Sequence, residues 1–296
     1  MGPVATVSVD VDPVDLHLIG YGHRDLPPDV LSYTVALPRL IDAFARAGIR
    51  ATMFVVGRDA AAHSGALRAL TAAGHEVASH SMTHPLALAS LDEERLHEEL
   101  VMSRTVLEAA CGEPMVGFRS PNYDMDARTL RHLEAAGYRY DASGYPTPFL
   151  LPARLLLALK SADPAAIFNL KLWPFTWRRA PYRTRGIMEF PVSVTPIVRF
   201  PFYHTARYVM SESRFLKLLE GFARRAESLS YVVHAVDALG LKEDKVDTRL
   251  SPHPGMELPL EQKLAILDRS LAAIAAAFQT LPFRDRLDAV PGGAKS

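Results

Sequence analysis

Two aspartates separated by one residue are the first side chains in the chain that could act in acid/base or metal chemistry. Asp10 and Asp12 end an apolar run, Val4–Val9, that has the pattern of a buried strand. Side chains alternate along a strand, so both carboxylates are expected on one face. Two carboxylates held so close repel each other, and a metal ion or a cationic partner must offset that repulsion.

Two histidines four residues apart follow a second short strand. His80 and His84 come after the expected strand Glu76–Ser79. Their spacing fits one helix face or the two sides of a tight loop, and Pro85 favours the loop because the residue before a proline avoids the helical region. Two imidazoles and one carboxylate suit a divalent metal that keeps positions open for water and substrate. A zincin motif is excluded, because Ser81 stands where that motif has glutamate.

A third histidine, His234, ends the apolar segment Val232-Val233. Taken alone, each of these residues has an ordinary structural explanation. A strand-end aspartate is commonly a helix cap or a turn residue, and a histidine in an apolar strand is commonly a core residue. Together and in this order, they supply an acid/base pair and three metal ligands for the hydrolysis of an amide.

Around these residues the chain resembles the polysaccharide deacetylase family, the NodB-homology enzymes of carbohydrate esterase type. The similarity covers roughly residues 4–143 and 187–240. The chain departs from the family pattern at Asn122, where many members have an aromatic residue, and at Val232, where the motif usually has leucine. The similar segments, in chain order, are Asp10–Asp12, Gly48–Gly57, Ala73–His84, Phe118–Pro121, Tyr140–Ser143 and Val232–His234.

The resemblance implies metal and acid/base roles at five positions. Asp12, His80 and His84 would bind one divalent metal, which we expect to be Zn²⁺, with Co²⁺, Ni²⁺ or Fe²⁺ as alternatives. Asp10 would be the general base, and His234 would be the general acid that protonates the leaving amine.

The resemblance also implies supporting roles. Arg119 would hold the general base ionised and oriented, and Asp141 in the fourth motif would belong to the catalytic set. The backbone N–H of Asn122, after Pro121, would help to bind the oxyanion, and Tyr123 would complete this substrate-binding group. Among the other histidines, His17 and His23 are candidates for the mouth of the site, and we interpret His253 as a loop residue.

Strand and helix patterns alternate along the chain, which indicates parallel strands with a site at their carboxyl ends. The family's distorted (β/α)₇ barrel fits this alternation, and we expect a single catalytic domain over residues 1–296 with a C-terminal helix at about 258–281. Asp92, Asp126 and Ser213 are expected helix N-caps. The expected strands are 4–9, 51–56, 76–79, 116–118, 188–192 and 230–234, and the expected helices are 37–47, 65–73, 91–110, 127–136, 213–227 and 260–277.

The composition of the chain narrows the expected cellular location and binding partners of the protein. The formal net charge is zero, so nothing suggests nucleic acid as a partner. The single cysteine, Cys111, excludes an internal disulfide. No signal peptide and no apolar stretch of about 18 residues is apparent, so we expect a cytoplasmic protein.

One segment, at about 144–187, does not fit the alternation and is expected to be an insertion. It has one acid, Asp163, and seven bases, together with both tryptophans, Trp173 and Trp177. Apolar runs with tryptophan and flanking bases are typical of an interfacial membrane element, which predicts peripheral contact with the inner face of the cytoplasmic membrane through residues 146–186. The alternative is a pair of helices that covers the barrel.

The sequence therefore predicts a metal-dependent hydrolase that removes the N-acyl group, such as acetyl, of an amino sugar. The basic and apolar segment favours a glycolipid or a lipid-linked saccharide as substrate. Two alternatives are an amidase or deformylase acting on a substrate that is not a polysaccharide, and a catalytically silent carbohydrate-binding barrel. A silent barrel has no need to keep a repelling pair of aspartates, which argues against the second alternative.

Overall fold

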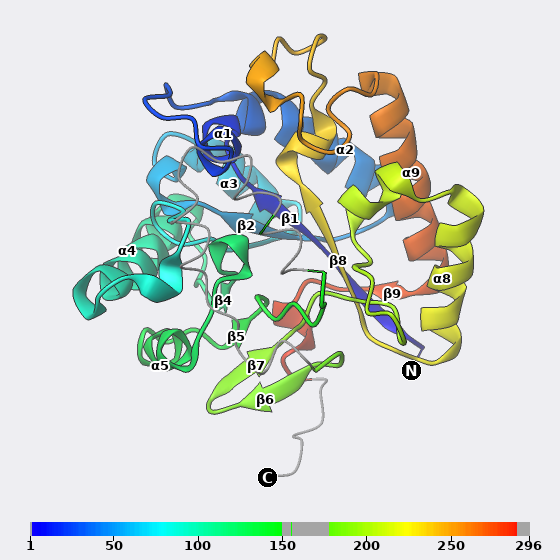
Figure 1. Ribbon diagram of the computed structural model, residues 1–296. Helices are drawn as coiled ribbons and strands as arrows, with labels where there is room; N and C mark the ends of the chain where they lie inside the picture. Colours follow the sequence, from blue (N-terminus) through cyan, green and yellow to red (C-terminus); the bar gives the residue numbers. More distant parts are fainter. Residues whose placement is uncertain (1, 150–154, 156–177, 289–296) are drawn as a thin grey trace.

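The computed structural model describes residues 2–149, 155 and 178–288. Within these ranges the chain forms one nine-stranded sheet in the order β6-β7-β5-β4-β3-β2-β1-β8, and β9 pairs with the start of β1 (Figure 1). Neighbouring strands run parallel except β6, which is antiparallel to β7. The strands are β1 (Val4–Val11), β2 (Thr52–Val55), β3 (Glu76–Ser79), β4 (Gly117–Phe118), β5 (Tyr140–Asp141), β6 (Tyr182–Thr184), β7 (Ile187–Glu189), β8 (Leu229–His234) and β9 (Gln279–Thr280).

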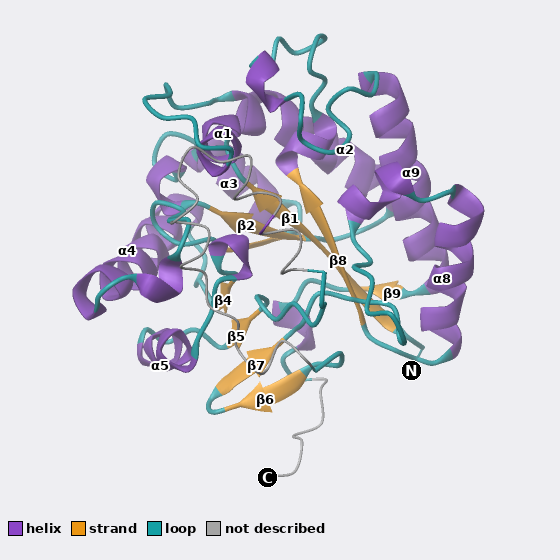
Figure 2. Cartoon of the chain, in the orientation of Figure 1, coloured by secondary structure: helices purple, strands orange, loops and turns teal. Residues whose placement is uncertain are grey.

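Helices connect the strands and lie around the curled sheet, as Figure 2 shows. The α-helices are α1 (Val14–Gly20), α2 (Leu37–Ala47), α3 (Ser64–Ala72), α4 (Glu93–Cys111), α5 (Ala127–Ala135), α8 (Glu212–Arg224) and α9 (Leu260–Ala277). Shorter helical turns are η1 (Ser32–Ala36), η2 (Gly57–Asp59), η3 (Leu88–Ser90), η4 (Pro121–Tyr123), η6 (His204–Val209), η7 (Ala235–Ala238), η8 (Thr248–Leu250) and η9 (Arg284–Arg286).

The largest apolar cluster holds the central strands in place. Val7 and Val9 of β1 and Tyr231 of β8 are fully buried and share this cluster with Phe44 of α2 and Leu271 of α9. Strands buried on both faces are expected to be largely apolar, as Val4–Val9 is apart from Thr6 and Ser8, because helices cover a parallel sheet. The polar residues that follow such a strand therefore lie at its carboxyl end, where the core stops.

Most helix boundaries agree with the pattern in the sequence. Asp92 and Asp126 cap α4 and α5 by accepting hydrogen bonds from the backbone N–H groups of Arg95 and Thr129, as predicted. The prediction of Ser213 as the N-cap of α8 is wrong. Ser211 caps this helix and accepts from the N–H of Arg214, because the helix begins one residue before Ser213.

Two elements near the site were absent from the sequence prediction. Helix α1 follows directly after Asp12 and Pro13, where no element was expected. Strand β6 adds an antiparallel edge at residues inside the segment 144–187. Both are short, and short elements depend on tertiary packing more than on local propensity.

The described part of the segment 144–187 makes contacts within the chain. Arg178 lies over the ring of Tyr182 at 4.6 Å, and Arg179 forms an ion pair of 2.9 Å with Glu227. Phe168, Trp173 and Trp177, on which the membrane prediction depends, lie outside the described residues. In the part of the chain that the structure describes, no helix is both long and apolar enough to cross a membrane.

Candidate active site

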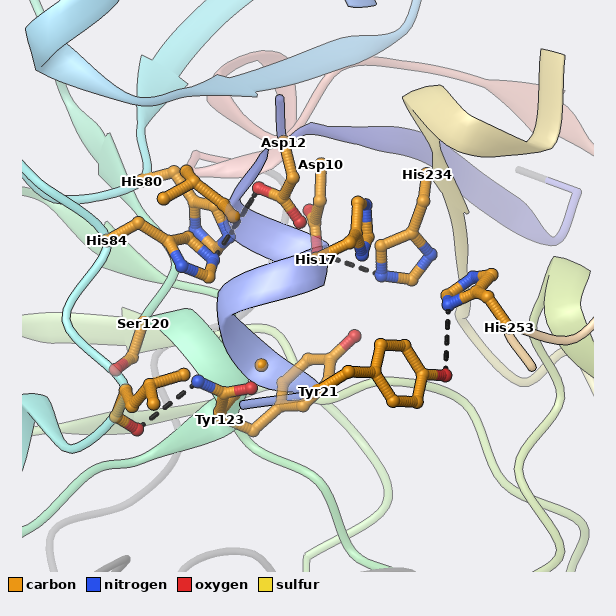
Figure 3. A pocket seen from close by; sticks show the side chains of 14 residues that line it. Asp10, Asp12, His17, Tyr21, His80, His84, Ser120, Tyr123, His234 and His253 are labelled. Carbon is orange, nitrogen blue, oxygen red and sulfur yellow. Dashed lines mark hydrogen bonds and ion pairs between the residues drawn. The ribbon is translucent and has the colours of Figure 1, made fainter. Parts of the chain in front are cut away.

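The polar residues singled out in the sequence converge on one cavity at the carboxyl ends of the parallel strands (Figure 3). The cavity has a volume of about 210 Å³. Asp10 and Asp12 reach it from the end of β1, His80 and His84 from the loop after β3, and His234 from the end of β8. The carboxyl ends of parallel strands meet at one edge of a sheet, which explains why residues so distant in sequence lie together.

Asp12, His80 and His84 form a group that could hold a metal ion. Asp12 Oδ1 lies 3.3 Å from His80 Nε2 and 3.6 Å from His84 Nε2. Among the described residues this is the group of three potential ligands whose donor atoms all lie within 4.8 Å of one another. Asp12 Oδ1 is buried and has no hydrogen-bond partner there, which is an unfavourable state for a carboxylate oxygen unless a cation binds it.

The environments of the two imidazoles suit them to act as metal ligands. His80 Nδ1 lies 2.7 Å from the backbone carbonyl oxygen of Arg119, and this oxygen can only accept, so Nδ1 carries the proton and Nε2 faces Asp12. Burial and the nearby His80 hold the pKa of His84 well below its usual 6.5, so His84 is uncharged at neutral pH. A carboxylate with two imidazoles fits a divalent metal with nitrogen and oxygen ligands.

The metal-site loop is held by a glutamate that the sequence analysis missed. Glu99 on α4 accepts hydrogen bonds from the backbone N–H groups of Met82 and Thr83, at 2.8 and 2.9 Å. His84 adopts a left-handed conformation with φ 60°, and its N–H donates to Ser81 Oγ at 3.0 Å. The loop predicted from Pro85 is therefore present. The signal for Glu99 was weak, because a glutamate on a helix is normally exposed.

Asp10 is paired with a buried arginine. Arg119 Nη1 lies 2.5 Å from Asp10 Oδ1 and also donates to Ser8 Oγ at 3.0 Å. The guanidinium is fully buried and lies over the ring of Phe54 at 4.1 Å. Burial alone would raise the pKa of Asp10, but Arg119, with smaller contributions from His80 and His234, lowers it below the usual 3.8. Asp10 is therefore ionised at neutral pH.

His234 lies beside Asp10 because of strand register. Strands β1 and β8 are parallel neighbours, and their pairing sets Asp10 opposite His234. His234 Nε2 lies 3.8 Å from Asp10 Oδ2, and its backbone N–H donates to Asp237 Oδ2 at 2.8 Å. An ionised carboxylate and an imidazole thus face the same cavity from adjacent strand ends, which is a geometry suited to paired proton transfer.

The turn after Arg119 contributes a further wall. Asn122 and Tyr123 line the cavity, and both have left-handed backbones, with φ 54° and 57°. The side-chain amide of Asn122 donates to the carbonyl oxygen of Leu86 at 3.2 Å. Pro121 is buried beside them but does not line the cavity. Two successive residues in this conformation turn the backbone sharply at the cavity edge.

Asp141 lies outside the cavity and connects to it through two serines. Its Oδ1 accepts from Ser143 Oγ at 2.5 Å, and Ser143 Oγ in turn accepts from the backbone N–H of Ser120 at 2.7 Å. Burial raises the pKa of Asp141, and burial together with Asp141 raises the pKa of Glu189, its register partner on β7, well above the usual value. The position of Asp141 allows it to order the turn that carries Arg119 rather than to contact a substrate.

Two histidines and a tyrosine that the motifs do not include also line the cavity. His17 comes from α1, Tyr21 directly follows that helix, and His253 comes from the loop after η8. His17 therefore lines the site, as one of the two mouth candidates, whereas His23 does not. The interpretation of His253 as a loop residue was incomplete, because this loop folds over the cavity. No local signal could have revealed this contact.

A curled parallel sheet with an aspartate and two histidines at its carboxyl edge, beside an aspartate paired with arginine, defines the class of NodB-type deacylase folds. Comparison with known proteins agrees with that class. Residues 26–140 match the polysaccharide deacetylase family. The matched range includes His80, His84 and Arg119 of the candidate site.

Several curated relatives carry deacetylase names. The chain is 30% identical over 142 residues to a peptidoglycan deacetylase of Helicobacter pylori, covering 46% of this chain and 47% of the relative. It is 30% identical over 199 residues to a peptidoglycan deacetylase-like protein of Gibberella zeae, covering 63% and 56%. A chitooligosaccharide deacetylase of Bradyrhizobium sp. is 32% identical over 78 residues, covering 26% and 35%. The chain thus spans about half the length of the first two relatives.

Solved structures share the fold at low sequence identity. A structure described as a polysaccharide deacetylase from Mycobacterium smegmatis superposes with a TM-score of 0.63 at 18% identity, covering 100% of this chain and 95% of that one. The PuuE allantoinase superposes with a TM-score of 0.59 at 16% identity, covering 96% and 89%. These likenesses confirm the predicted NodB-type barrel, here with a sheet curled into part of a barrel.

Proposed function

We propose that this chain is a metal-dependent hydrolase that removes the N-acetyl group of an amino sugar. The observation that carries the proposal is the convergence of two groups on one cavity: Asp12 with His80 and His84, and Asp10 with its neighbours Arg119 and His234. The names of the relatives, peptidoglycan and chitooligosaccharide deacetylases, support an N-acetylated sugar as the substrate class.

Asp12, His80 and His84 would hold the metal, and their nitrogen and oxygen donors suit Zn²⁺, with Co²⁺, Ni²⁺ or Fe²⁺ as alternatives. A divalent metal bound there would polarise the acetyl carbonyl and make water a stronger nucleophile at neutral pH. His80 is kept in the ligating tautomer by the carbonyl oxygen of Arg119, so the protein orients this ligand before the metal arrives.

The remaining groups would move protons and bind charge. Asp10, kept ionised by Arg119, would take the proton from the attacking water. His234, in its protonated form, would give a proton to the amine nitrogen as the C–N bond breaks, because an unprotonated amine is a poor leaving group. The backbone N–H of Asn122 at the sharp turn would donate to the oxyanion, a contribution of roughly 10²–10³-fold in rate.

The proposal extends to a lipid-linked substrate reached from the inner face of the cytoplasmic membrane. Its support is the composition of residues 146–186, which combine apolar runs, both tryptophans and several bases. Phe149 and Leu155, at the start of this segment, are 38% and 50% exposed. Against this, Arg178 and Arg179 already have partners within the chain, so they would contribute less to binding an anionic surface.

Acetate and formate release from a panel of amides would test the function. Purified protein loaded with Zn²⁺ should release acetate from N-acetylated chitooligosaccharides or glycolipids, and Asp10→Asn should remove that activity. Non-sugar amides belong in the same panel, since the fold is shared with an allantoinase. Hydrolysis of non-sugar amides alone would replace the sugar assignment by an amidase, and absence of any hydrolysis by the metal-loaded protein would contradict the proposal.

A further inference from the structure

The side of the cavity opposite the metal-binding group is made by residues that the proposed reaction does not use. His17 on α1 and His253 after η8 are 236 residues apart in the chain, yet their ring centroids lie 5.1 Å apart. The ring centroid of His17 is 6.1 Å from that of His234. Figure 3 shows the three imidazoles in a row, with His17 next to His234 and His253 next to Tyr21. We call His17 and His253 the histidine wall.

The histidine wall is held firmly. Asp15, two residues before His17 on α1, forms a 2.6 Å ion pair with Arg58, whose backbone N–H donates to the carbonyl oxygen of Met82 in the metal-site loop. On the other side, Tyr21 Oη lies 3.5 Å from His253 Nδ1. The wall is therefore linked through Arg58 to the same loop that carries His84.

Two buried nitrogens of the wall lack a partner. Within the described residues, His17 Nε2 and His253 Nε2 are buried and have no hydrogen-bond partner. Leaving a buried polar atom unsatisfied costs about 1–3 kcal/mol. Two such atoms on one wall of one cavity are explained if a ligand that enters the cavity makes these hydrogen bonds.

The charge state of the wall narrows the chemistry of that ligand. Burial lowers the pKa of His17 to about 3, with a further contribution from His253, and burial lowers the pKa of His253 to about 4. Both rings are uncharged at neutral pH. A neutral imidazole has one donor and one acceptor nitrogen, which matches a hydroxyl group that can both donate and accept. Asp10 and Asp12 in the same cavity disfavour an anion.

We propose that the histidine wall is a hydroxyl-binding subsite that positions the sugar so that its acetamido nitrogen lies next to His234. The inference rests on the proposed function and deepens it, since it assigns a part of the substrate to residues outside the family motifs. The apolar surface of Leu16 and the ring of Tyr21, both in the cavity lining, lie alongside the sugar in this arrangement.

Direct binding measurements test the subsite without relying on turnover. The probe is N,N′,N″-triacetylchitotriose, titrated by calorimetry into Zn²⁺-loaded Asp10→Asn protein, which does not consume it. In this background His17→Phe and His253→Phe should each weaken binding by about 2- to 10-fold, as expected for the loss of one neutral hydrogen bond. His253→Gln, which keeps a donor and an acceptor, should recover part of the affinity. His97→Phe, on the exposed side of α4, is the matched control and should bind as the parent does.

Ligand analogues identify the group that is recognised. In a series of 3-, 4- and 6-deoxy N-acetylglucosamine ligands, at least one deoxy change should weaken binding to the parent but not to His17→Phe or His253→Phe. If every deoxy change weakens binding to the variants as much as it weakens binding to the parent, neither histidine makes a direct hydrogen bond to the removed hydroxyl. Tighter binding of N-acetylglucosamine 6-phosphate or inorganic phosphate than of the neutral sugar, lost in both variants, would overturn the hydroxyl assignment in favour of an anion.

The outcomes separate this inference from the proposed function. Metal content and circular dichroism of the variants, matched to those of the parent, establish that the fold and the metal group are intact. If wild-type protein deacetylates the sugar while both histidine variants bind it with unchanged affinity, the subsite is wrong and the function stands. If metal-loaded protein neither binds nor hydrolyses any N-acetylated sugar, the proposed function and the subsite are both overturned.

Discussion

At the scale of single residues, the site separates two chemically identical carboxylates by their neighbours. Asp10 contacts Arg119 and lies beside His234, whereas Asp12 faces His80 and His84. A guanidinium favours a carboxylate that must stay ionised to accept a proton. Two imidazole nitrogens beside Asp12 suit a bound cation instead. The same residue type thus has two different environments, and these suit the two different roles proposed for Asp10 and Asp12.

The two aspartates should respond differently to the same substitution. Asp10→Asn removes the proton acceptor and should lower kcat by roughly 10²–10⁴-fold while the metal content stays near that of the wild type. Asp12→Asn removes a charged ligand and should lower the metal affinity itself. Elemental analysis and steady-state kinetics on the same preparations measure both effects. Equal metal loss in both variants would show that the two carboxylates share the ligand role.

Arg119 should set the acid limb of the pH profile. Burial raises the pKa of Asp10, and the guanidinium of Arg119 brings it below 3.8. In Arg119→Gln, Asp10 is still buried but no longer faces a positive charge. The pKa of Asp10 should therefore rise, and this base should become protonated at a higher pH. The acid limb of kcat/KM should therefore shift to higher pH. Arg95→Gln, on an exposed position of α4, is the control, and an identical acid limb in both variants would contradict this role for Arg119.

At the scale of elements, the site depends on register and on turns rather than on long helices. The pairing of β1 with β8 sets Asp10 opposite His234, and the pairing of β5 with β7 sets Asp141 opposite Glu189. A shift of one residue in a strand would turn its side chains to the other face and dismantle both pairs. The same sheet also carries a buried acid far from the reaction, Glu76 on β3.

Glu76 should make stability depend on pH. Its side chain accepts hydrogen bonds from Thr52 Oγ1 at 2.7 Å, Tyr140 Oη at 2.9 Å and the N–H of Arg284 at 3.1 Å. Burial nevertheless raises the pKa of Glu76 from 4.5 to about 7. Between these two pH values the folded protein holds a proton that the unfolded chain has released. This contribution to the unfolding free energy is present at pH 4.5 and is lost as the pH rises to 7, by up to about 1.4 kcal/mol per pH unit.

Urea unfolding at a series of pH values between 4.5 and 8 measures this term. Glu76→Gln cannot titrate, so its unfolding free energy should fall less steeply with pH than that of the wild type, whatever constant offset the substitution adds. Glu98→Gln on the exposed side of α4 is the matched control and should keep the wild-type slope. Parallel curves for wild type and Glu76→Gln would mean that Glu76 does not titrate in this range.

At the scale of the whole molecule, the cavity is assembled from segments that are far apart in the described chain. Helix α1 and the loop that carries His253 close over the carboxyl edge of the sheet, while β9 returns to pair with the start of β1. A site closed by segments so far apart in sequence exists only in the complete fold. How the molecule would reach a lipid-linked substrate is a separate prediction, which rests on the composition of residues 146–186.

Membrane attachment through residues 146–186 is testable by sedimentation with vesicles. Each base near an anionic surface contributes about 1 kcal/mol, and salt screens this term, so wild-type protein should sediment with anionic vesicles at low salt and much less at high salt. Trp173→Ala combined with Arg178→Glu and Arg179→Glu should abolish sedimentation while hydrolysis of a soluble acetamido sugar continues. If the wild-type protein does not sediment with anionic vesicles at low salt, the prediction of a lipid-linked substrate loses its support.

Local patterns in the sequence were sufficient to predict several helix bounds, two helix caps and one loop. The helix bounds of α2 and α9, the caps Asp92 and Asp126 and the loop before Pro85 follow from periodicity, capping and proline, because each depends on residues a few positions apart. The family motifs, read in order, also named Asp10, Asp12, His80, His84 and His234, which meet in the cavity. The alternation of strands and helices indicated where they meet.

Only the tertiary structure decided the contacts between distant segments. The register that places His234 beside Asp10, the indirect path from Asp141 through Ser143, the support of the metal-site loop by Glu99 and the approach of His253 to His17 have no local signal. Each results from packing elements that are separated by tens to hundreds of residues. The sequence by itself therefore determined the similarity to the family, most of the order of the elements and the candidate reactive groups, and the packing of the whole chain decided which neighbours surround those groups.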